Sequence, residues 1–112
     1  MNKICTTIEQ SQKLIELGID VNTADMMWDD WSLIDEGWKL SVGYYPEIEK
    51  DYGRKCYPAW SLSALLSILP DYTLQTNTDG TVFVVCESKK PVISDVYDDP
   101  IDACYEMILK LH

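Results

Sequence analysis

Hydrophobic residues recur at every third or fourth position in three segments of the chain. This spacing places them on one side of an amphipathic helix. It predicts helices over residues 7–17, over residues 62–69 and from residue 100 to the end of the chain. The last of these has the longest apolar stripe, so we expect it to be buried along one side.

Residues suited to helix ends flank these three segments. At the first helix two capping-box registers are possible, Thr6 with Glu9 or Thr7 with Gln10. The remaining end signals are Gly18 after the first helix, Ser61 before the second, and Asp99 with Pro100 before the third.

Strands are predicted where apolar and polar residues alternate. Residues 38–42 have this alternation, and residues 26–28 predict a brief strand. Residues 72–76 and 81–87 flank Asp79-Gly80, a dipeptide that favours a hairpin turn. The second strand of this hairpin is rich in Val and Phe, as a central strand would be.

The segments between these elements are predicted as turns and loops. Asp29-Asp30 indicates a turn, and the polar stretch 46–55 indicates a loop. The predicted order is helix, two strands, helix, two strands, helix. We therefore expect a single α+β domain over residues 1–112, with a small antiparallel sheet of three to four strands packed against three helices.

The chain is strongly acidic, and this narrows its choice of partners. Its 112 residues include 19 acids and 9 bases, for a net charge of −10. Direct nucleic-acid binding is not expected, because phosphate contacts depend on Lys and Arg. A cationic partner would be attracted. No apolar run is long enough for a signal peptide or a membrane span, so we predict a cytoplasmic protein with no membrane contact.

The cysteines and the histidine do not form a recognisable catalytic or metal site. Cys5, Cys56, Cys86 and Cys104 are widely separated and contain no CxxC pair, so they predict reduced thiols and no zinc site. Cys86 and Cys104 lie within apolar patterns and are predicted to be buried. His112 is the last residue, which is a poor position for a general base. No glycine-rich phosphate loop is present, and the sequence predicts no cofactor.

Residues 20–36 form the most suggestive segment, because they combine acids with Met and Trp and contain no base. Two interpretations stay open. Either the aromatic side chains are exposed and form a protein-contact surface with the acids, or they point into the core and leave the acids in solvent. The candidate surface residues are Asp25, Trp28, Asp29, Asp30, Trp31, Asp35 and Glu36.

Four short segments carry a resemblance to a known group of proteins. They are ICTTIEQS at 4–11, LGIDVNTADM at 17–26, PAWSLSALL at 58–66 and PIDACYEM at 100–107. Together they resemble a family of small uncharacterised bacterial and phage-associated proteins. The resemblance implies a mobile-element or prophage setting. It supplies no functional residues, because the family has no assigned activity.

Three hypotheses about function follow. The preferred one is a non-enzymatic acidic module that binds a protein partner or a second copy of itself. One alternative is a small enzyme or ligand-binding domain that uses carboxylates beside a Trp-lined pocket. The other is a structural homodimer. The acidity, the lack of a catalytic motif and the resemblance favour the first.

Overall fold

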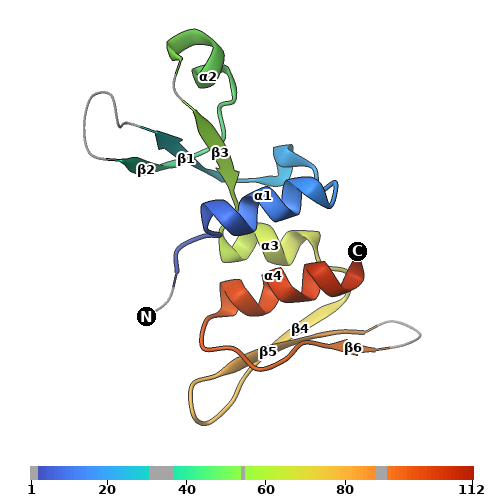
Figure 1. Cartoon of the computed structure of the whole chain (residues 1–112). Helices are drawn as coiled ribbons and strands as arrows, with labels where there is room; N and C mark the ends of the chain where they lie inside the picture. Colours follow the sequence, from blue (N-terminus) through green and yellow to red (C-terminus); the bar gives the residue numbers. More distant parts are fainter. Residues whose placement is uncertain (1–2, 31–36, 54, 88–90) are drawn as a thin grey trace.

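The computed structural model describes residues 3–30, 37–53, 55–87 and 91–112. Within these residues the chain is an α+β protein, which confirms the predicted class (Figure 1). The elements in chain order are α1 (Ile8–Glu16), the 3-10 helix η1 (Val21–Thr23), β1 (Met26–Asp30), β2 (Trp38–Val42), α2 (Glu47–Tyr52), β3 (Cys56–Ala59), α3 (Leu62–Ile68), β4 (Tyr72–Thr76), β5 (Val82–Cys86), β6 (Val92–Ile93) and α4 (Pro100–Leu111).

The three predicted helices correspond to α1, α3 and α4. At α1 the second capping-box register forms: the Thr7 hydroxyl accepts from the Gln10 amide at 3.1 Å, and the Gln10 side chain accepts from the Thr7 amide at 3.0 Å. The Ser61 side chain caps α3, and the Asp99 carboxylate caps α4. These ends were predictable because each cap depends only on neighbouring residues.

The fourth helix, α2, was not predicted. The expectation of a loop over residues 46–55 is therefore wrong. Glu47 and Glu49 lie in the first turn of α2, where the helix dipole favours anions. The helix ends at Gly53, whose φ of 68° is the left-handed conformation that favours glycine at a helix end.

The strands form two antiparallel sheets of three strands each, where the sequence suggested a single sheet. The first sheet has the order β2-β1-β3, and the second has the order β4-β5-β6. The predicted turn at Asp29-Asp30 is wrong, because both residues lie within β1. Asp29 pairs with Lys39 on one side and with Cys56 on the other, so pairing on both sides overrides the turn preference of Asp.

The core lies between the second sheet and a layer of helices. α4 packs against β5 and against α3 (Figure 1). Cys86 and Cys104 are both buried here, as the sequence predicted. Further core residues include Leu14, Trp60, Leu65, Val82, Val84, Ile101, Met107 and Ile108.

The first sheet extends away from this core (Figure 1). It is joined to the helix layer where α1 packs against β3. The radius of gyration is 15.2 Å, whereas a compact chain of this length is expected to have about 13 Å. The molecule is accordingly elongated, with extents of 47 × 29 × 18 Å. Among the described helices, none has both the length and the apolar character that crossing a membrane would demand.

Candidate functional site

The two faces of the first sheet differ in how they are covered. The strand register places Trp28 between Leu40 and Tyr57, so these three side chains share a face. Trp38 and Val42 lie two positions to either side of Leu40 and point to the same face. We call the face formed by Trp28, Trp38, Leu40, Val42 and Tyr57 the open face.

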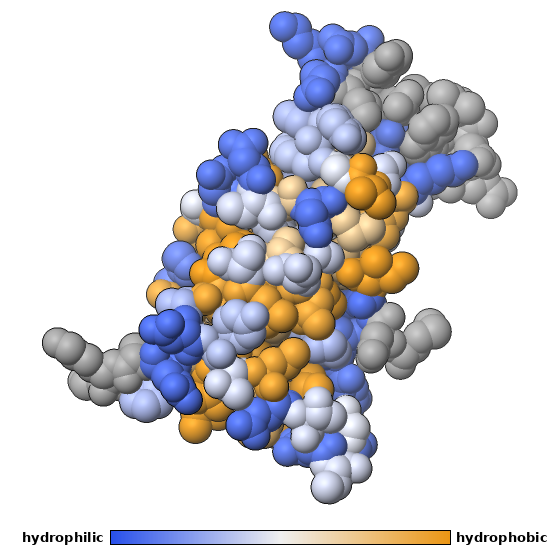
Figure 2. All heavy atoms as spheres, turned by 180° about the vertical axis from the view of Figure 1, so that it is seen from behind, coloured by the Kyte–Doolittle hydropathy of each residue, from blue (hydrophilic) through white to orange (hydrophobic). Residues whose placement is uncertain are grey.

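Much of the open face is accessible to solvent. Val42 is 82% exposed and Trp38 is 37% exposed, while Trp28, Leu40 and Tyr57 are half-buried. The rings of Trp38 and Tyr57 contact each other across β1, with centroids 5.6 Å apart. Figure 2 shows hydrophobic side chains at the surface over much of the molecule seen from behind, and not only beside the first sheet.

On the opposite face, the side chains of β1 and β3 are buried, whereas Lys39 at the β2 edge is exposed. Met27 and Asp29 are almost fully covered, and Cys56 is also buried. Burial, followed by the nearby carboxylates of Glu49 and Asp29, raises the pKa of the Cys56 thiol. Glu49 belongs to α2, so this helix lies beside Cys56 on the opposite face, whereas Trp38 and Val42 on the open face remain exposed.

A segment at the N-terminus, residues 3–7, runs along one edge of the open face and is held there by hydrogen bonds. The Thr6 amide donates to the Trp60 carbonyl at 2.9 Å, and the Trp28 indole donates to the Thr6 carbonyl at 2.9 Å. The Lys3 ammonium forms an ion pair with Asp102 of α4. These contacts fix the segment between the helix layer and the first sheet.

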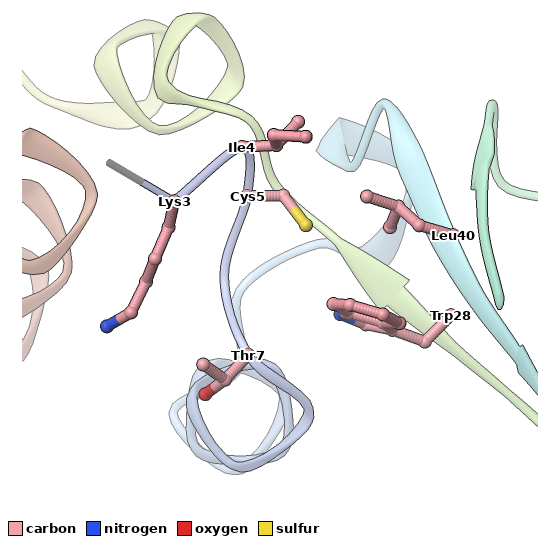
Figure 3. Close-up of a pocket in the computed structure, with 6 residues that line it drawn as sticks. All are labelled: Lys3, Ile4, Cys5, Thr7, Trp28 and Leu40. Carbon is pink, nitrogen blue, oxygen red and sulfur yellow. The ribbon is translucent and has the colours of Figure 1, made fainter. Parts of the chain in front are cut away.

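A pocket of about 270 Å³ lies between this segment and the open face. In Figure 3 the side chains of Ile4, Cys5, Trp28 and Leu40 surround the space, whereas the Lys3 side chain points away from it. The residues that line the pocket are Lys3, Ile4, Cys5, Thr7, Trp28 and Leu40.

The polar atoms of this lining are already engaged. The Lys3 ammonium is paired with Asp102, the Thr7 hydroxyl accepts from Gln10, and the Trp28 indole donates to Thr6. Burial, with a smaller contribution from the Asp25 carboxylate, raises the pKa of the Cys5 thiol to about 11. The thiol is thus neutral at physiological pH and behaves as a small apolar group. The pocket therefore offers mainly apolar surface.

The structure distributes the sequence-predicted surface residues over different environments. Trp28 and Asp30 lie on the same side of β1, whereas Asp29 points to the buried opposite face. Asp25 is exposed, and its carboxylate accepts from both the amide and the hydroxyl of Ser61, so it has a structural role at the start of α3. The candidates Trp31, Asp35 and Glu36 lie outside the described residues.

The sequence candidates left out most of the residues that shape this site, among them Ile4, Cys5, Leu40, Val42 and Tyr57. A partial signal was present, because the alternation over residues 38–42 predicts one apolar strand face. No pattern indicated that Trp38 and Val42 on this face would remain exposed. The placement of Ile4 and Cys5 depends on contacts with residues distant in the sequence.

The described residues contain no cluster of side chains suited to bind a metal ion. No group of three or more His, Cys, Asp and Glu side chains converges there as a metal site would require.

No known protein-family model, curated protein or solved structure matches this chain. The resemblance to small phage-associated proteins therefore stays a prediction.

Proposed function

We propose that this chain is a protein-binding module, and that its partner is a basic segment of another protein that lies on the open face. The observation that carries the proposal is the exposure of apolar side chains on an edge strand. Val42 and Trp38 lie within β2, which is paired with β1, and yet remain accessible. Apolar surface gathered in one patch is typical of protein contact sites, and Trp contributes large contact area at low entropic cost.

The charge of the chain favours a basic partner. The net charge of −10 attracts a cationic segment over a Debye length and speeds its association. The same charge opposes a second copy, because two such chains repel each other. Self-association is therefore the less favoured occupant of the open face.

The position of β2 supports an extended partner. β2 forms one edge of the first sheet. A segment that added to this edge would extend the sheet and place every second side chain on the open face. Such a segment would alternate apolar and basic residues.

The carboxylate-based alternative has less support. It requires a carboxylate in a concave Trp-lined site, and the pocket beside Trp28 is lined by none. The cytoplasmic and prophage settings belong to this proposal as predictions from the sequence.

Binding to an array of synthetic peptides tests the proposal. The peptides should favour an extended conformation, and their net charge and apolar content should be varied independently. We expect the protein to bind basic peptides with alternating apolar residues in preference to acidic or fully polar ones. The variant Val42→Ser should lose this binding, because it removes exposed apolar surface from the open face.

Ile93→Ser is the matched control, since Ile93 is 57% exposed but belongs to the second sheet. It should bind as the unmodified protein does. Equal loss in both variants, or binding that ignores peptide charge, would contradict the proposal. Concentration-dependent dimers that Val42→Ser abolishes would instead identify a second copy as the occupant.

A further inference from the structure

We infer that the pocket between Ile4, Trp28 and Leu40 is a binding site for one aromatic ring, which the basic partner supplies as a side chain. The inference rests on the proposed function and adds the identity of the anchoring group. It is carried by the volume of the pocket, the chemistry of its lining and its position beside β2.

The volume suits a single ring. A cavity of about 150 Å³ lined by aliphatic and aromatic side chains is large enough for benzene. The pocket here has about 270 Å³, and Ile4, Trp28 and Leu40 provide the aliphatic and aromatic side chains of its lining. It therefore accommodates the ring of Phe, with space for the linking methylene group.

The lining selects an apolar group over a polar one. Its ammonium, hydroxyl and indole groups are already bonded to Asp102, Gln10 and Thr6. Because the accessible lining is almost entirely apolar, a polar side chain entering the pocket would lose its hydration and gain few hydrogen bonds, which carries a free-energy cost. An aromatic ring loses nothing in this way, and it gains an edge or offset contact with the ring of Trp28.

The position of the pocket links it to the open face. Leu40 is shared by both, and Val42 follows two residues later on the same side of β2. Ile4, which is 69% exposed, forms an accessible part of the pocket wall. A segment lying along β2 can thus insert one ring beside Leu40 while its basic residues remain in solvent near this acidic chain.

Toluene is the direct probe, because it is a single ring without a polar group. We expect saturable changes in the NMR chemical shifts of Ile4, Cys5, Trp28 and Leu40. Cys5→Leu extends a side chain into the space and should weaken toluene binding about tenfold or more, a typical cost of a steric change in an apolar pocket.

Two further variants keep this test interpretable. Ile4→Ser alters an exposed part of the wall, so it should fold normally and still weaken toluene binding. Val96→Ser changes a residue that is 55% exposed and lies outside the pocket, and it should leave binding unchanged. Shifts that do not saturate, or that persist equally in Cys5→Leu and Ile4→Ser, would overturn the ring site.

A peptide experiment separates this inference from the proposed function. The probe is a basic peptide from the array that carries one phenylalanine. Replacing that phenylalanine with alanine should weaken binding to the unmodified protein about 30-fold, as expected for an anchoring residue, and should have much less effect on binding to Cys5→Leu. Equal losses would overturn the anchoring role while the proposed function stands. If toluene saturates the pocket but no basic peptide binds, the proposed function fails although the ring site is real.

Discussion

The central strand β5 of the second sheet and the edge strand β2 of the first each carry a row of apolar side chains on one face, but the row on β5 lies beneath α4 whereas the row on β2 is partly exposed. In the second sheet, Val82, Val84 and Cys86 of β5 are almost fully buried beneath α4. In the first sheet, Val42 and Trp38 of β2 remain exposed. An alternating apolar pattern therefore specifies a strand face in both sheets, but it does not specify what that face contacts.

This difference distinguishes residues that stabilise the fold from residues that are available to a partner. Burying a large aliphatic side chain stabilises a protein by about 1.5–3 kcal/mol, and the side chains of β5 are already buried when the chain folds. On the open face much of the same free energy remains available to a partner. Substitutions in the second sheet and its helices should therefore affect stability, whereas those on the open face should affect association.

The largest expected difference is between Met107 and Val42. Met107 of α4 is fully buried, so Met107→Ala should lower the free energy of unfolding by about 2–5 kcal/mol. Val42→Ala should change it by less than about 0.5 kcal/mol, because Val42 is 82% exposed. Urea unfolding followed by circular dichroism measures both. Similar losses would show that the open face belongs to the folding core after all.

A second prediction concerns stability at alkaline pH, and it compares the Cys5 thiol beside the pocket with the Cys104 thiol in the core. Burial raises the pKa of Cys5 from 9.0 to about 11 and that of Cys104 from 9.0 to about 12. Well below pH 9 both thiols keep their protons in the folded and unfolded states, so the contribution of each neutral buried thiol to stability is fully present. Above that pH the unfolded chain releases protons that the folded chain retains. Stability should then fall by about 1.4 kcal/mol per pH unit for each thiol, until the pH reaches its folded pKa.

Urea unfolding at several pH values from neutral to strongly alkaline tests this expectation. Cys5→Ala and Cys104→Ala should each reduce the slope of stability against pH, whatever their effect at neutral pH. A slope that neither variant changes would mean that other groups control the alkaline response.

The parts of this fold that were predictable depend on contacts between near neighbours in the sequence. α3, α4 and the hairpin of β4 and β5 are defined by local caps, periodicity and turn residues. β3 was missed because it pairs with β1, which brings Met26 beside Ala59. The division into two sheets depends on the same long-range pairing, which no local pattern encodes.

The candidate site was predictable to a similar extent. Trp28 was one of the sequence candidates, because Met and Trp are concentrated among acids there, and it lies on the open face. Ile4 and Cys5 were missed because residues 3–7 are positioned by Trp60 and Asp102, which lie far along the chain. A surface built from separate segments becomes visible only when the fold is known.

A smaller effect is expected at Asp99, which connects the core to the segment beside the pocket. Its carboxylate accepts from the Ile101 amide at the start of α4 and from the Lys3 amide. Asp99→Ala should lower the free energy of unfolding by about 0.5–2 kcal/mol, the usual range for losing a helix cap. Its neighbour Asp98 is exposed, so Asp98→Ala is the matched control and should remain within about 0.5 kcal/mol of the unmodified protein. Thermal unfolding measures both variants. Equal effects would mean that the loss of one negative charge, and not the loss of the helix cap, changes the stability.

The smallest expected effect concerns Asp25, the predicted surface residue that the structure places against α3. Asp25→Ala removes the acceptor for the Ser61 amide and hydroxyl, so it should lower stability by about 0.5–1.5 kcal/mol.

The same substitution should also lower the pKa of the Cys5 thiol part of the way toward 9.0, because the Asp25 carboxylate is the second cause of its elevation after burial. Alkylation of Cys5 by iodoacetamide, resolved by peptide mass spectrometry across a pH series, should then shift to lower pH. Glu47→Ala removes an exposed carboxylate that affects Cys56 and not Cys5, so it should leave the Cys5 profile in place. An unchanged Cys5 profile in Asp25→Ala would mean that burial alone sets this pKa, and that the acids before β1 do not influence the pocket.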